Sequence, residues 1–155
     1  MAKTRVIKQI GAGLREWDYL YGALDVVGGN AHFLHLPEVS LDCYGQFLGS
    51  LAERYPGCHH VVIADQAGFH FEPGDPRLPE RVHILPLPPY SPELAPCEQA
   101  WRFLKESVSN AIHDGIEQLR DALFPGLCHF WEEPSRVRSL VGRPWLHYKA
   151  NASSN

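Results

Sequence analysis

The chain has 155 residues, of which 45% are hydrophobic and 21% are charged, and its formal net charge is −4. This length suits one domain with a single core, and the share of apolar residues excludes a disordered chain. The negative charge argues against a small basic protein that coats DNA, but it is compatible with an acidic catalytic domain. Because no apolar run approaches the roughly 18 residues of a membrane span and the first residues lack a signal-peptide core, a cytosolic protein is expected.

The four cysteines never approach CxxC spacing, so we expect reduced thiols rather than a zinc site or disulfides. The run Cys58-His59-His60 is the one cluster of metal-ligating types. Neighbouring side chains on a strand point to opposite faces, so these three do not converge easily on one ion.

The N-terminal third reads as three strands. Residues Thr4–Ile10 alternate in a strand-like way, and Trp17–Val27 is rich in aromatic and branched residues and closes with glycines. Ala31–Pro37 follows after a tight turn, which predicts a hairpin. From Ser40, a typical N-cap, apolar residues fall at helical spacing up to about Tyr55.

The central and C-terminal parts continue the alternation. His59–Asp65 reads as a short buried strand, typical of a sheet covered on both faces, and Val82–Pro88 as another strand. Helices are predicted from near Pro96 and over Gly115–Leu127. The tail, residues 132–155, is expected to be irregular.

This order of elements predicts an α/β fold, a mixed sheet with helices on its faces. We expect one domain over residues 1–131, followed by the tail.

Two acidic residues stand where a metal site could form. Asp65 ends an apolar strand, and Glu98 opens a helix after a loop stiffened by four prolines between Pro86 and Pro92. Each also has an ordinary explanation. An acid often ends a strand, and a glutamate in the first turn of a helix is favoured by the helix dipole.

Two segments resemble the catalytic core of the DDE transposases, in the insertion-sequence branch of the mariner superfamily. In that family a strand ends in Asp followed by Asn or Gln and a nearby His, which matches Asp65, Gln66 and His70. A Leu-Pro-Pro-Tyr-Ser-Pro loop then leads to a helix with Glu and Trp. In this chain the loop is residues 87–92 and the glutamate is Glu98. The resemblance extends roughly from Thr4 to Leu123, and the separation of Asp65 and Glu98 is typical of the family.

The resemblance implies a ribonuclease-H-like fold and DNA cleavage and strand transfer with two Mg²⁺ or Mn²⁺ ions. One ion activates the attacking oxygen and the other stabilises the leaving oxygen, and hard cations of this kind prefer carboxylate ligands. Asp65 would then be the second acid of the triad and Glu98 the third, both as catalytic residues and metal ligands.

Other residues are secondary candidates. The resemblance makes Gln66, His70, Tyr90 and Lys105 candidates for contacts with DNA or with the metal ligands, although a histidine in a turn can equally be structural. Asp25 is the candidate substitute for the first acid of the family, for which the sequence has no match at the expected strand. Ala95 stands where the family usually has Asn.

These departures predict a domain whose first strand is missing or replaced, and which is impaired as an isolated chain. Thr4–Ile10 could fill the gap in the sheet, or two chains could pair there, so a homodimer is expected. DNA, and a full-length transposase or an upstream-encoded partner, are the other expected partners. The alternatives are a non-catalytic co-opted or regulatory domain that associates with full-length transposase, and a ribonuclease-H-like nuclease outside transposition.

Overall fold

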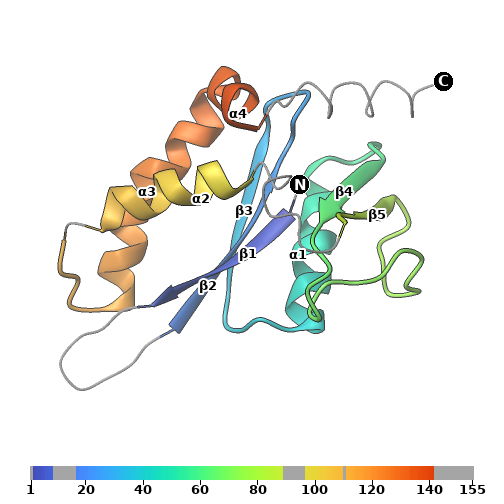
Figure 1. The fold of residues 1–155 in the computed structure, drawn as a ribbon, viewed down its shortest axis with the longest axis horizontal. Coiled ribbons are helices and arrows are strands. Elements are labelled where there is room, and N and C mark those ends of the chain that lie inside the picture. Colours follow the sequence, from blue (N-terminus) through green and yellow to red (C-terminus); the bar gives the residue numbers. More distant parts are fainter. Residues whose placement is uncertain (1, 9–16, 89–96, 110, 142–155) are drawn as a thin grey trace.

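All strands of the described structure precede its last three helices (Figure 1). The computed structural model describes residues 2–8, 17–88, 97–109 and 111–141, the first range by its backbone alone. Within these ranges the elements follow in the order β1 (Ala2–Lys8), β2 (Trp17–Leu24), β3 (Ala31–Leu36), α1 (Leu41–Arg54), β4 (His60–Ala64), β5 (Val82–Pro86), α2 (Cys97–Val108), α3 (Ile116–Glu132) and α4 (Pro134–Val141). The predicted α/β fold is confirmed.

The strands form two small sheets that meet at β1. β2 pairs antiparallel with both β1 and β3, with Lys8 opposite Trp17 and Leu24 opposite Ala31. β4 and β5 pair in parallel, and β1 contacts β4. The β2 edge that was expected to lie open is therefore occupied by β1. This arrangement is compatible with a ribonuclease-H-like nuclease fold.

Helices cover the two faces of the three-stranded sheet, and the alternation of β2 side chains explains why (Figure 1). Tyr21 and Ala23 point to one face and pack in a core that includes α1, β4 and β5. Leu20 and Leu24 point to the other face and pack with α2, α3 and α4. Because successive residues of a strand face opposite ways, β2 serves both cores.

The first helix begins as the sequence predicts. The Ser40 side chain accepts a hydrogen bond from the Cys43 amide at 3.2 Å, which satisfies one of the free N–H groups of the first turn. The buried side of α1 is made by Cys43, Tyr44, Phe47, Leu48 and Leu51.

The C-terminal part is more regular than the sequence predicts. α3 continues past Pro125 to Glu132, and a further helix covers residues 134–141, so the expected irregular tail is wrong for this stretch. Gly126 lets α2 approach closely, since a Cβ there would lie 3.0 Å from Leu104. Both α3 and α4 contribute buried side chains to the core of α2. These contacts compensate for the hydrogen bond that a proline removes from a helix.

The β4–β5 sheet is not covered on both faces, as its apolar run had suggested. Val62 and Ile84 are buried towards α1. Val61 is 54% exposed and Leu85 45% exposed on the opposite face. The apolar run of β4 therefore reflects one buried face and one exposed apolar face.

One carboxylate joins α3 to the sheet from inside the core. The side chain of Asp18 on β2 is 2% exposed. Arg120 of α3 donates to both of its oxygens, Nη2 to Oδ1 at 2.9 Å and Nε to Oδ2 at 3.2 Å, and the ring of His35 bonds to Oδ2 as well. Burial alone would raise the pKa of Asp18, but the hydrogen bonds and charges of His35 and Arg120 lower it to about 2.

This ion pair predicts a pH-dependent contribution to stability. Since the pKa of Asp18 falls from 3.8 to about 2 on folding, the contribution is fully present above pH 3.8 and is lost as the pH falls through 2. We expect Asp18→Asn to lower the free energy of unfolding by ~2 kcal/mol at pH 7, and by much less near pH 2. Urea denaturation of both chains across this range measures the difference.

Asp75→Asn is the matched control. Hydrogen bonds from Arg77 lower the pKa of Asp75 to about 2 as well, but this pair lies at the surface. We expect its effect to be small and to vanish in about 0.5 M NaCl, while the effect of Asp18→Asn persists. If salt removed both effects equally, the Asp18 pair would not act as a buried one.

Candidate active site

Asp65 is delivered by β4. Val62 and Ala64 are buried and hold the strand against the α1 side, and the chain leaves the sheet at the next residue. The carboxylate of Asp65 is 45% exposed, while the backbone at its base is held by the strand.

The turn after β4 folds back onto Asp65. The Nδ1 atom of His70 lies 2.9 Å from the carbonyl oxygen of Asp65 and 2.9 Å from its Oδ1. The backbone N–H of His70 donates to the carbonyl of Ala67 at 2.9 Å, and the N–H of Ala67 donates to Asp65 Oδ1 at 3.4 Å. Both the backbone and the carboxylate of Asp65 are held by residues close in sequence.

Gln66 ties the tip of β4 to the end of β5. Its Nε2 donates to the carbonyl of Leu87 at 2.8 Å, and the N–H of Leu87 donates to the carbonyl of Ala64 at 2.8 Å. Leu87 is the first residue of the proline-rich loop motif. The side chain of Gln66 thus holds the start of the loop that leads to Glu98, a contact that spacing alone does not reveal.

Glu98 lies in the first turn of α2 and is partly buried. Lys105 is exposed in the last turn of the same helix, and two helical turns return it to nearly the same side as Glu98. Tyr90 lies outside the described residues, as does Ala95.

A close contact seats α2 on the sheet. The ring of Trp101 lies over Gly22 of β2, where an added Cβ would stand 2.8 Å from Trp101 Cη2 and 2.9 Å from Phe33. The two rings meet at 6.2 Å between centroids, edge to face. Only glycine leaves room for Trp101, so this position fixes how closely the helix that carries Glu98 approaches β2.

Asp25 shapes the turn between β2 and β3. Its Oδ1 accepts from the amides of Val27 and Gly28 at 2.9 Å each, and its Oδ2 accepts from Asn30 at 2.9 Å. Burial alone would raise the pKa of Asp25, but these hydrogen bonds lower it. They also end β2 at Leu24, three residues earlier than predicted. A metal-binding role for Asp25 stays a prediction.

No three His, Cys, Asp or Glu side chains of the described residues gather closely enough to hold a metal ion. Asp65 and Glu98 supply carboxylate oxygens, the donors that Mg²⁺ and Mn²⁺ prefer, so their chemistry fits such ions. The third ligand is not found within the described ranges. Asp18, the other acid near the expected position, is neutralised by Arg120.

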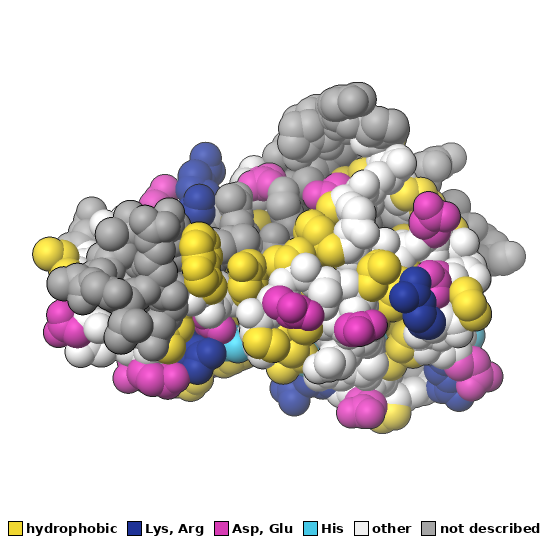
Figure 2. All heavy atoms as spheres, turned by 90° about the horizontal axis from the view of Figure 1, so that it is seen from below, with side chains coloured by type: hydrophobic (Ala, Val, Ile, Leu, Met, Phe, Trp, Pro, Cys, Tyr) yellow, Lys and Arg dark blue, Asp and Glu magenta, His cyan; other side chains and the backbone are white. Residues whose placement is uncertain are grey.

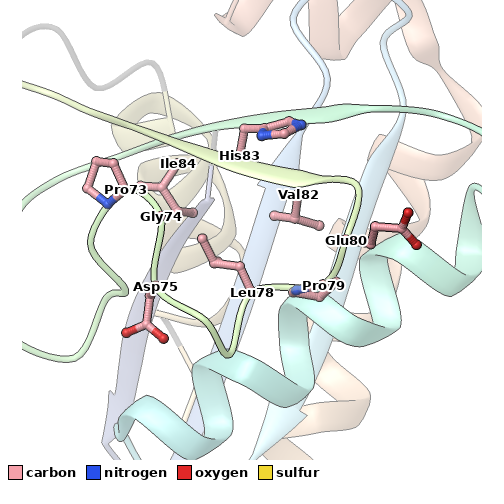
Figure 3. Close-up of a pocket in the computed structure, with 9 residues that line it drawn as sticks. All are labelled: Pro73, Gly74, Asp75, Leu78, Pro79, Glu80, Val82, His83 and Ile84. Atoms are coloured by element: carbon pink, nitrogen blue, oxygen red, sulfur yellow. The ribbon is translucent and has the colours of Figure 1, made fainter.

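The surface offers little to grip a nucleic acid on the face seen in Figure 2. Acidic side chains are spread across it, and the described Lys and Arg side chains stand apart rather than in one patch. A shallow pocket of about 290 Å³ lies between the 73–80 loop and β5 (Figure 3). Leu78, Val82 and Ile84 line it, and Asp65 and Glu98 are not among its walls.

Comparison with known proteins shows the family of this chain. A family model described as DDE superfamily endonuclease matches residues 4–120, which include Asp65 and Glu98. The chain belongs to this family. It is also 31% identical over 137 residues to an uncharacterized protein, y4pE/y4sA, of Sinorhizobium fredii (strain NBRC 101917 / NGR234), covering 84% of this chain and 98% of that one.

As a DDE superfamily endonuclease, the chain belongs with transposase-like nucleases, which act on DNA and usually use divalent metal ions. None of the helices in the described ranges has both the length and the apolarity needed to cross a bilayer.

The contact between Gly22 and Trp101 predicts that a side chain at position 22 would disturb the packing of α2 on the sheet. We expect Gly22→Ala to lower the free energy of unfolding by about 1–3 kcal/mol, because a methyl group would push Trp101 and Phe33 aside. Thermal or urea denaturation measures this loss.

Gly49→Ala is the matched control, because Gly49 lies in α1 with no atom within 4 Å of an added Cβ. We expect it to stabilise the chain by about 0.5–1 kcal/mol, as alanine favours helix. An equal and neutral effect of both substitutions would show that α2 is not seated on Gly22.

Proposed function

We propose that this chain is the catalytic core of a transposase of the insertion-sequence branch of the mariner superfamily. Its substrate would be transposon-end DNA in the bacterial cytosol, with Asp65 as the second acid of the triad and Glu98 as the third. One observation carries the proposal. The tip of β4, which bears Asp65, is hydrogen-bonded through Gln66 to Leu87, where the loop to Glu98 begins. This hydrogen bond fixes the end of β4 relative to the start of the segment that leads to Glu98, which suits two acids that must share a cation site.

The proposed chemistry is the in-line attack on a phosphodiester with Mg²⁺ or Mn²⁺. Such ions activate the attacking oxygen and stabilise the leaving oxygen when about 3.5–4 Å apart. The side chains of Asp65 and Glu98 would hold the cations, and their own supports, the β4 turn and α2, would limit how far they move. Lys105 and Tyr90 remain candidate DNA contacts.

We further propose that the chain on its own has little strand-transfer activity. The two acids nearest to the expected first ligand already have other partners. Asp18 is buried against Arg120, and Asp25 caps its own turn. A first acid, together with a DNA-reading region, would then come from residues upstream of the matched segment, from a separately encoded partner or from a full-length transposase.

A second candidate function is a non-catalytic domain that acts by association. The open apolar face of the β4–β5 sheet, with Val61 and Leu85, favours it. The expected homodimer belongs with this candidate, although β1 already occupies the edge of β2 that first suggested pairing. Light scattering of the purified chain, with Val61→Lys as the variant, distinguishes a monomer from a dimer on this face.

The metal site predicts weak binding that depends on both acids. We expect Mn²⁺ to bind the chain with low affinity in isothermal titration, because two carboxylates replace the usual three. Asp65→Asn and Glu98→Gln should each weaken binding at least about tenfold. Glu106→Gln is the control, since Glu106 is an exposed acid further along the same helix. Equal Mn²⁺ affinity of the unsubstituted chain and all three variants would show that Asp65 and Glu98 do not bind the ion.

The impaired activity predicts a further result. We expect the purified chain to cut transposon-end DNA slowly or not at all with Mn²⁺, because the acids nearest to the expected first ligand, Asp18 and Asp25, already have other partners. Gel assays on labelled end DNA measure this. Robust metal-dependent cleavage that Asp65→Ala abolishes would show instead that the chain is a complete enzyme.

A further inference from the structure

We propose that His70 is a positioning residue that orients the carboxylate of Asp65 for its cation. The inference rests on the proposed function, because it assigns the support of an acid in the proposed metal site. It commits to one of the two roles for which His70 was a candidate, the contact with a metal ligand, and not to the contact with DNA.

The contacts of His70 point inwards, to Asp65. Nδ1 is hydrogen-bonded to the carbonyl oxygen of Asp65 at 2.9 Å, and Oδ1 of the same residue lies 2.9 Å from Nδ1, within ion-pair distance. Since both oxygens are acceptors, the proton belongs on Nδ1. The ring nitrogen therefore lies against both the backbone and the carboxylate of Asp65, which limits how the carboxylate can rotate.

Packing restricts the rotation of the imidazole. Its side chain is 2% exposed, and the rings of Tyr44 and Phe69 each lie 4.5 Å from it between centroids, the first tilted and the second edge to face. A support that is itself locked by packing transmits little motion to the residue it holds.

The opposite nitrogen argues against a role in stability alone. Nε2 of His70 is buried and has no hydrogen-bond partner among the described residues, and the same is true of the hydroxyl of the neighbouring Tyr44. A buried polar atom without a partner costs stability. A residue that only filled this space would be apolar, so the useful part of His70 is the Nδ1–H that faces Asp65.

Burial raises the pKa of the Tyr44 hydroxyl, and the negative charge of Asp65 raises it further. Tyr44 is therefore neutral, and within the described residues its hydroxyl makes no hydrogen bond to the carboxylate. Together these contacts resemble the outer partners of metal ligands, whose loss usually weakens metal binding about 10–100-fold.

The test compares two substitutions that differ in the donor. His70→Asn places an amide N–H near the position of Nδ1, whereas His70→Leu keeps bulk and removes the donor. Leu119→Ala is the matched control, because it lowers stability from the core shared by α2, α3 and α4, to which His70 does not belong. Each chain is titrated with Mn²⁺ by calorimetry, and its melting temperature is recorded.

We expect His70→Leu to weaken Mn²⁺ binding about tenfold or more, and His70→Asn to stay within about threefold of the unsubstituted chain. Leu119→Ala should lower the melting temperature without changing the affinity. Equal losses of affinity in His70→Asn and His70→Leu, or a loss of affinity in Leu119→Ala that follows its lower melting temperature, would overturn the positioning role.

A second measurement separates this inference from the metal site. Long-range ¹H–¹⁵N spectra of the metal-free chain should show His70 with its proton on Nδ1, and Asp65→Asn should shift that signal. If the unsubstituted chain bound no Mn²⁺, the proposed function would fail, and the spectra would then decide alone. A proton on Nε2, or a signal that Asp65→Asn leaves unchanged, would overturn the role of His70.

Discussion

The arrangement of this protein depends on β2, a strand whose two sides are both buried. Tyr21 packs towards α1 and the β4–β5 pair, and Leu20 packs towards α2, α3 and α4. The same eight residues contribute to both cores, so the elements that carry the two acids of the proposed site pack on one strand. Gly22 adds the closest contact, since it lets Trp101 press α2 onto the strand. Without that strand, the layer that carries Asp65 and the layer that carries Glu98 would not share a common element.

Each acid has its own support. Asp65 is held by the turn that returns through His70, and Glu98 by a helix whose apolar side is buried against the sheet. Gln66 couples the first support to the start of the loop that leads to the second. Hydrogen bonds of this kind restrict geometry more than they add stability, which is what a site for closely spaced cations requires. The family membership and these supports point the same way.

The other acids illustrate how burial and partners decide the role of a carboxylate. Asp18 and Asp25 lie on or next to the same strand, and both have a lowered pKa. Asp18 carries a structural ion pair through the core, and Asp25 closes a hairpin turn. Neither role needs an exposed oxygen. Asp65 differs from Asp18 in that nearly half of its side chain surface is accessible.

Local pattern in the sequence determined the order of strands and helices, the N-cap at Ser40 and the position of both candidate acids, because each depends on residues close in the chain. Only the tertiary structure shows where contacts between distant residues override the local pattern. The sequence predicts a helix that ends at Leu127, yet buried contacts with α2 carry α3 onwards to Glu132. The same holds for Gln66, whose partner Leu87 lies 21 residues away. A contact between distant residues leaves no period or spacing in the sequence, so only the folded chain could reveal it.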